Sequence, residues 1–188
     1  MTSHYIDITL RPDPEFSRVH LLGALVAKLH RALVEFRADD IGISFPQYSL
    51  SPRFLGDVLR LHGDESRLQE LMARGWMQGM RDHVKLTDVM RVPSGAMHRV
   101  IQRRQFKTNV ERMRRRRMRR KGETEAQGAA AIPDTVERRP DLPYVHLRSA
   151  STGQPFCLFV DQKGEVAASV PGTFNSYGLS CGATVPWF

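Results

Sequence analysis

Residues 5–10, YIDITL, alternate between apolar and polar side chains, so they predict a strand with one buried face. Ile6, Ile8 and Leu10 share that face, and the following RPDP at residues 11–14 ends the strand. Apolar residues then recur at helical spacing across residues 18–36. A half-buried strand followed at once by an amphipathic helix predicts the start of a mixed α and β fold.

The elements that follow complete a β-α-β-β-α-β order over residues 1–95. A second helix is predicted in GDESRLQELMARG, with Asp64 as its N-cap and Gly75 as its stop. We therefore expect a ferredoxin-like domain, an arrangement that many RNA-binding modules share. The third predicted strand, DVLRLH, lacks the stacking aromatics of RNA-recognition domains, so we do not expect RNA on that sheet face. The further strands are predicted at residues 41–45, 57–62 and 84–92.

Beyond residue 95 the pattern predicts a smaller β-rich domain, residues 96–188, that includes an arginine-rich helix. The overall class is thus α+β. Residues 123–134, ETEAQGAAAIPD, are expected to be a mobile linker of small residues or a weak helix. Strands are expected at residues 97–107, 144–149, 155–161, 166–170 and 183–188.

The positive charge of the chain is concentrated in one stretch. The formal net charge is +8, yet residues 99–121 contain twelve of the 28 lysines and arginines and one of the 20 acidic residues. The rest of the chain therefore holds 16 basic and 19 acidic residues. Such a segregated charge is typical of a surface that docks an anionic partner.

The central part of this stretch, TNVERMRRRRMRRKG at residues 108–122, predicts a helix of about 12 residues. Thr108 and Glu111 form a capping box, and Gly122 is a C-terminal stop. The two methionines do not form a broad apolar face, which disfavours a membrane-surface or calmodulin-type helix. Five arginines fall within an arc of about 140°: Arg112, Arg115, Arg116, Arg119 and Arg120.

A solvated charged helix would need acidic partners at i and i+4, and these are missing. Neutralisation by a polyanion is therefore favoured, and arginine suits phosphates and guanine edges. A short RNA hairpin is a plausible target, although composition alone also permits DNA. Arg103 and Gln105 are expected on one face of the strand at 97–107, either as base-edge contacts beside the helix or as ordinary strand surface.

The sequence also predicts a cytoplasmic protein without a membrane anchor. The N-terminus has no basic region followed by an apolar one, and no apolar run approaches eighteen residues. Cys157 and Cys181 are too few for a disulfide framework or a zinc site. No HExxH, paired-cysteine or clustered-carboxylate pattern is present, so neither a metal nor a cofactor is expected.

Seven short motifs stand in a characteristic order and spacing along the chain. They are HYIDITLRPDPEF at 4–16, KLHRAL at 28–33, NVERMRRRRMRR at 109–120, IPDT at 132–135, LPYVHLRSASTGQPF at 142–156, YGLS at 177–180 and VPWF at 185–188. Together they resemble the subtype I-F CRISPR precursor-crRNA processing endoribonucleases, the subunits that cleave the repeat hairpin in the type I-F surveillance complex. The resemblance extends over nearly the whole chain.

The resemblance implies a metal-independent ribonuclease that binds a stem-loop and cuts at the 3′ base of its stem. His30 corresponds to the catalytic histidine, Ser149 to the serine that holds the attacking 2′-hydroxyl, and Tyr177 to the tyrosine that restrains the histidine. Arg103 and Gln105 correspond to a base-reading pair. The other RNA-binding residues implied or expected are Lys107, Arg112, Arg115, Arg116, Arg119, Arg120, Lys121, Ser151, Thr152 and Phe156, the last as an aromatic that stacks at the foot of the stem.

The expected partners are the CRISPR repeat RNA hairpin and other subunits of the complex, with the protein itself monomeric. A non-catalytic subunit that binds hairpin RNA is the alternative. Three positions depart from the family pattern: Val110 replaces a proline, Lys121 a histidine and Cys181 a lysine.

The residues themselves allow this chemistry. An RNA strand can be cleaved by its own 2′-hydroxyl if a base removes the proton, and histidine suits this task at neutral pH. His30 lies about 70° from the centre of the apolar stripe of its predicted helix, at the border between core and solvent. Without the resemblance, a structural helix histidine would be the simpler interpretation, as turn formation would be for Ser149 and packing for Tyr177.

Overall fold

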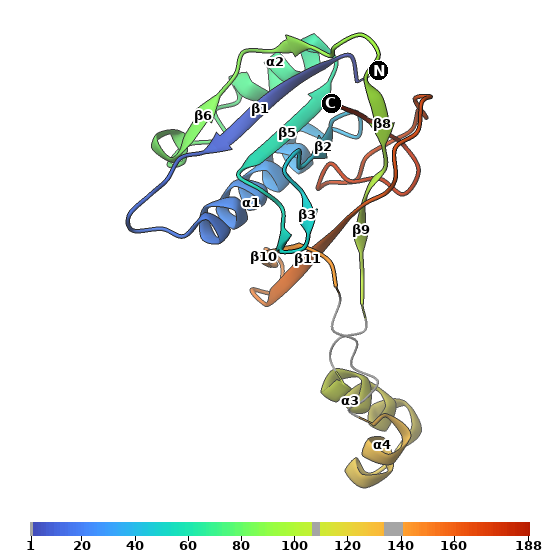
Figure 1. Cartoon of the computed structure of the whole chain (residues 1–188). Helices are drawn as coiled ribbons and strands as arrows, with labels where there is room; N and C mark the ends of the chain where they lie inside the picture. The colour runs from blue at the N-terminus through green and yellow to red at the C-terminus, as the bar shows by residue number, and fades with distance from the viewer. Residues whose placement is uncertain (1, 107–109, 134–140) are drawn as a thin grey trace. The chain divides into compact units, whose positions relative to one another are not determined.

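The computed structural model describes residues 2–106, 110–133 and 141–188, which form two compact units (Figure 1). The first unit joins Met1–Arg104 to Leu142–Phe188, and the second is Gln105–Asp141. Helices and antiparallel sheets confirm the α+β class. These two units are defined by contacts within the chain, whereas the predicted domains, 1–95 and 96–188, were defined as parts that fold separately. The predicted division into two domains therefore stays a prediction.

The main sheet of the first unit has the strand order β2-β5-β1-β6, with β7 also paired to β1. All of its pairs are antiparallel, and α1 and α2 lie behind the sheet in Figure 1. A short hairpin of β3 and β4 is inserted between β2 and β5. The bounds are β1 His4–Leu10, α1 Arg18–Phe36, β2 Gly42–Ser44, β3 Ser49–Leu50, β4 Arg53–Phe54, β5 Val58–Gly63, α2 Glu65–Ala73, a 3-10 turn Arg81–His83, β6 Val84–Leu86 and β7 Met90–Arg91.

The strand predicted at residues 84–92 is interrupted. Ile8 pairs with Leu86 in β6, whereas Tyr5 pairs with Met90 in β7, so the register along β1 slips by one residue between them. An extra residue on one strand is the mark of a bulge, which bends the edge of a sheet. Thr87 fills the gap, since its backbone N–H donates to the Asp7 carbonyl and its hydroxyl accepts from the Asp7 N–H.

The two faces of the main sheet are both covered by the chain itself. Leu59 and Leu61 are fully buried members of the core that includes α1 and α2. Arg60 and His62, which alternate with them on β5, are also buried. Arg60 lies under the ring of Phe188, 4.1 Å from its centroid, so the C-terminal segment covers that face. The C-terminal residue therefore occupies this face of the sheet beside β5.

A second sheet has the order β10-β11-β9 and shares the core of the first unit. The backbone of Phe45 and the side-chain amide of Gln162 exchange two hydrogen bonds, and these join the two sheets. Helix α1 packs on β10 at Gly23, where an added Cβ would lie 2.8 Å from the His146 carbonyl oxygen. A close approach of this kind requires glycine. The bounds are β8 Met97–Arg99, β9 Ile101–Arg104, β10 Tyr144–Arg148, β11 Pro155–Gln162 and β12 Val185–Trp187.

Two strand predictions in this half of the chain were wrong in detail. The stretch at 97–107 divides at Val100, because β8 pairs with β12 while β9 pairs with β11, and β9 ends at Arg104. Residues 166–170 form only an isolated bridge between Val166 and His98. There Thr184 substitutes for a neighbouring strand, since its hydroxyl accepts a hydrogen bond from the Val170 N–H.

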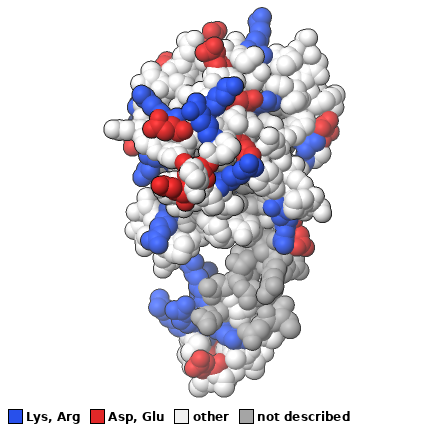
Figure 2. All heavy atoms as spheres, turned by 60° about the vertical axis from the view of Figure 1, so that its left-hand side comes forward, with Lys and Arg blue, Asp and Glu red and all other residues white. Residues whose placement is uncertain are grey.

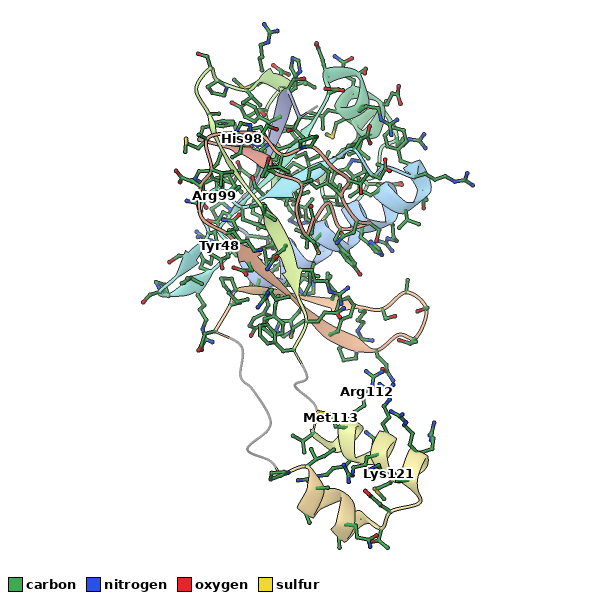
Figure 3. The ribbon with its side chains drawn as sticks, turned by 90° about the vertical axis from the view of Figure 1, so that its right-hand side faces the viewer. Tyr48, His98, Arg99, Arg112, Met113 and Lys121 are labelled. Atoms are coloured by element: carbon green, nitrogen blue, oxygen red, sulfur yellow. The ribbon has the colours of Figure 1, made fainter. Side chains whose placement is uncertain are left out.

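The second unit contains helices α3, Val110–Lys121, and α4, Glu125–Ala131 (Figure 3). Helix α3 matches the predicted arginine-rich helix, although Thr108 of its predicted capping box lies outside the described residues. The second helix occupies the stretch expected as a linker or weak helix, and Thr124 and Gln127 form its capping box. In the described parts of the chain, no helix is long and apolar enough to cross a membrane.

Candidate active site and RNA-binding surface

His30 lies on α1, half-buried, at the border between core and solvent that the helical pattern predicted. Its Nδ1 is 2.8 Å from the backbone carbonyl oxygen of Ser176. A carbonyl oxygen can only accept a hydrogen bond, so Nδ1 must carry the proton. In the neutral ring, Nε2 then has a free lone pair and can accept a proton from a substrate.

The ring of Tyr177 stacks on His30, with centroids 4.0 Å apart and planes 5° from parallel. The loop that presents it is built around Asn175, whose side-chain oxygen accepts hydrogen bonds from the N–H groups of Tyr177 and Leu179. Gly178 adopts φ +71°, and its carbonyl accepts from the Ile43 N–H of β2. The stack and the Ser176 hydrogen bond together fix the orientation of the imidazole.

The hydroxyl of Tyr177 stays protonated at neutral pH. Burial raises the pKa of Tyr177 above its usual value of 10.0, while the nearby charge of Arg103 opposes this rise. A neutral phenol ring can restrain His30 without adding a charge beside it. This restraint accords with the role that the resemblance implies for Tyr177.

Arg103 of β9 connects the tyrosine to the second sheet. Its guanidinium lies 5.7 Å from the ring centroid of Tyr177 and 5.7 Å from that of Phe156 on β11. Its Nε is buried and has no hydrogen-bond partner among the described residues. Gln105 is exposed just after the end of β9, and the common strand face predicted for it and Arg103 is therefore not formed.

Ser149 begins the turn between β10 and β11. Its hydroxyl accepts a hydrogen bond from the Thr152 N–H at 3.3 Å and lies 3.1 Å from the Ser151 hydroxyl. Both Ser151 and Thr152 are exposed. Gly153 closes the turn at φ +65°, with its N–H donating to the Ser149 carbonyl.

A series of contacts connects this turn with His30 inside the first unit. Phe156, which contacts Arg103, pairs across the strands with Leu147, two residues before Ser149. Among the described residues, His30 and Ser149 make no hydrogen bond with each other.

On α3 the predicted cationic face is the exposed face. The arginines turned away from it, Arg114 and Arg117, are partly buried, as are both methionines. In Figure 2, blue and red side chains alternate over the first unit, whereas blue side chains gather around α3. Lys107 lies outside the described residues. The exposed cations of α3 are Arg112, Arg115, Arg116, Arg119, Arg120 and Lys121.

Sequence reasoning missed the groups that hold the site in place. The Ser176 carbonyl has no sequence signature, but Asn175 two residues before Tyr177 is typical of a turn built by an asparagine side chain. The pairing of Arg117 with Glu123 was also missed. No group of three histidine, cysteine or acidic residues is placed to hold a metal ion in the parts of the chain described.

The sequence of this chain is similar to a known protein family and to named relatives. Residues 5–188 match the family described as CRISPR-associated protein (Cas_Csy4). A relative from Pseudomonas aeruginosa (strain UCBPP-PA14), named CRISPR-associated endonuclease Cas6/Csy4, is 47% identical over 185 residues, covering 98% of this chain and 99% of the relative. A relative of the same name from Escherichia coli (strain UTI89 / UPEC) is 42% identical with the same coverage. The chain therefore belongs to the Csy4 family of CRISPR-associated proteins.

Proposed function

We propose that this protein is a metal-independent endoribonuclease that binds the stem-loop of CRISPR repeat RNA and cuts at the 3′ base of the stem. The observation that supports it most is the His30 imidazole, which is held by the Ser176 carbonyl at Nδ1 and by the Tyr177 ring, so that the neutral ring can accept a proton at Nε2. The relatives from Pseudomonas and Escherichia are both named as endonucleases. The finer assignments, which are the metal-independent reaction, the position of the cut and the RNA contacts, rest on the resemblance of the motifs to this family.

In the proposed reaction, Nε2 of His30 removes the proton of the 2′-hydroxyl at the cleavage site, which Ser149 holds. The oxygen attacks the adjacent phosphorus in line, the bond from phosphorus to the 5′-oxygen breaks, and the departing 5′-oxygen takes up one proton from solvent. The products are a 2′,3′-cyclic phosphate and a 5′-hydroxyl. A histidine acting as general base contributes about 10²- to 10⁴-fold to such a step.

The proposed RNA contacts lie on both units. The exposed cations of α3 bind phosphates along the stem, Arg103 and Gln105 contact base edges, and Phe156 stacks at its foot. The residues that we propose to contact RNA also include Lys107, Ser151 and Thr152. Because these contacts involve the part of the RNA that remains after cleavage, the product stays bound. We further propose that the protein is monomeric and assembles with other subunits of the surveillance complex.

Cleavage in excess EDTA tests this proposal. The purified protein and its repeat RNA should yield a 2′,3′-cyclic phosphate, whereas a substrate with a 2′-deoxy nucleotide at the cleavage site should bind and remain intact. Intact natural RNA under these conditions would instead favour the alternative, a non-catalytic hairpin-binding subunit. Identical cleavage of the deoxy substrate would contradict the 2′-hydroxyl mechanism.

Tyr177 should influence the rate through the ring rather than the hydroxyl. Tyr177→Phe keeps the stack on His30, so we expect cleavage within a factor of about two of wild type. Tyr177→Ala removes the stack, and a loss of about 0.5–1.5 kcal/mol of ring contact corresponds to a two- to tenfold slower reaction. Single-turnover rates with saturating protein measure both. Equal loss in the two variants would mean that the hydroxyl participates.

If the α3 arginines contact phosphates, replacing one of them should reduce the salt dependence of RNA binding. Arg115→Ala and Arg119→Ala should each weaken affinity for the uncleavable hairpin and flatten the plot of log affinity against log salt concentration. The expected change is about 0.7–0.9 in slope for each lost phosphate contact. Fluorescence anisotropy at several salt concentrations gives the slope, and an unchanged slope would remove that arginine from the RNA surface.

A further inference from the structure

Helix α3 needs support in the absence of RNA. Its twelve residues include seven arginines and a lysine, and like charges at i and i+4 repel one another. Arg112, Arg116 and Arg120 form one such row. Isolated helices of this length are marginal even when their sequence is favourable. Something inside the second unit must therefore offset the repulsion.

One part of that support is a pair of hydrogen bonds from Arg117. Its Nε and one terminal nitrogen reach the two carboxylate oxygens of Glu123 at 2.6 and 3.0 Å. The fork geometry of this contact makes it stronger than a single point contact. The hydrogen bond from Arg117 also lowers the pKa of Glu123, so the carboxylate is charged at neutral pH.

The second support for α3 is its packing against α4. An added Cβ on Gly128 would lie 3.3 Å from Cγ of Met118, so the two helices touch at this glycine. Arg114 donates from Nε to the carbonyl oxygen of Ile132, at the end of α4. Thus Arg114 bonds the end of α4 and Arg117 bonds the connection between α3 and α4, whereas the predicted cationic face is exposed.

We propose that Glu123 and α4 form a brace that holds α3 folded before RNA binds, and that Arg117 and Arg114 are positioning residues rather than RNA contacts. This inference rests on the proposed RNA binding of α3. It divides seven arginines of one helix into two functional groups by their neighbours. Helical spacing already separates these two arginines from the face of five, and their contacts with Ile132 and Glu123 give them a role.

Glu123→Gln gives the decisive test, because simple electrostatics and the brace predict opposite signs. Removing a negative charge beside α3 should strengthen RNA binding if Glu123 acts only through its charge. If it braces the helix, affinity for the uncleavable hairpin should fall about two- to fivefold, the value of an exposed ion pair. Glu125→Gln, an equal charge change at an exposed acid in the first turn of α4, is the matched control and should not weaken binding.

A second test compares the salt dependence of RNA binding in alanine variants of two adjacent residues, Arg116 and Arg117. Arg116→Ala should lower the salt slope by about 0.7–0.9, whereas Arg117→Ala should lower affinity with the slope nearly unchanged. The exchanged pair Arg117→Glu with Glu123→Arg should restore affinity that Arg117→Glu alone removes. A slope change in Arg117→Ala equal to that in Arg116→Ala, or no rescue by the exchanged pair, would overturn the proposal.

Amide hydrogen exchange of residues 110–121 without RNA separates this inference from the proposed function. Faster exchange in Glu123→Gln and Arg117→Ala, but not in Glu125→Gln or Arg116→Ala, is the expected result. It would support the brace even if the wild-type protein failed to bind the repeat hairpin. Unchanged exchange in all four variants would refute the brace even if RNA binding were normal.

Discussion

His30→Ala should slow cleavage of the repeat hairpin by about 10²- to 10⁴-fold while leaving RNA affinity within a factor of about two. The proposed role of His30 is to take one proton through Nε2, and alanine cannot accept it. None of the described residues proposed to bind RNA hydrogen-bonds His30, whose ring bonds the Ser176 carbonyl. Single-turnover cleavage and anisotropy on the same samples measure the two effects.

His20→Ala is the matched control for this experiment. His20 lies on the same helix but is exposed and stacks on Phe16, so its removal should leave the cleavage rate unchanged. His30→Asn adds a second control, because an amide can still donate to the Ser176 carbonyl but is not a base at neutral pH. Rapid cleavage by both His30 variants would exclude His30 as the general base.

His62 should make the folded state sensitive to mild acid. It is fully buried on β5, where its Nε2 lies 2.8 Å from the Ser44 hydroxyl. Burial, followed by the charges of Arg60 and His98, lowers the pKa of His62 from 6.5 to about 3. His98 comes from β8, which Figure 3 shows with Arg99 beside it. Protonating His62 would place a charge in this enclosed site.

The direction of the pH effect follows from which state binds the proton. Below pH 6.5 the unfolded chain protonates His62, whereas the folded protein does not until about pH 3. The stabilisation from this group is therefore complete above pH 6.5 and is lost as the pH falls toward 3. At about 1.4 kcal/mol per pH unit, the free energy of unfolding should drop by about 3 kcal/mol from pH 7 to pH 4 through His62 alone.

Urea unfolding of wild type and His62→Gln at several pH values tests this. Glutamine can still hydrogen-bond Ser44 but does not titrate, so the difference between the two proteins should shrink by about 3 kcal/mol on acidification. His146→Gln, at an exposed position, is the matched control and should follow wild type. Parallel pH profiles for wild type and His62→Gln would mean that His62 gains its proton readily in the folded state.

Local patterns predicted most of the secondary structure because they depend on neighbours in sequence. The apolar period across 18–36 located α1 to its observed bounds, since a helix must bury its one apolar stripe. The same reasoning placed five arginines of α3 on one face, and that face is exposed. Such reasoning failed at Val100, where the strand divides because its two halves pair with different partner strands. It also failed at 166–170, where Val170 bonds the side chain of Thr184.

The candidate site depended more on tertiary structure. Helical spacing put His30 at the border of the core, but its tautomer follows from the Ser176 carbonyl, 146 positions away in sequence. The sequence motifs selected Tyr177 without showing that its ring would lie flat on His30. Nothing in the spacing of α3 predicted that α4 would pack against Met118.

Amphipathic periods and the concentration of arginines were thus sufficient for the elements, the α+β class and the cationic face, because burial and charge repulsion act on residues that a helix or strand brings together by its own geometry. Folding of the first unit decided which carbonyl holds His30 and which ring covers it. These contacts join segments about 146 residues apart, so they form only when the core has brought those segments together. The contact of Arg117 with Glu123 is closer in sequence, six residues apart, but it forms only because the chain turns back after α3.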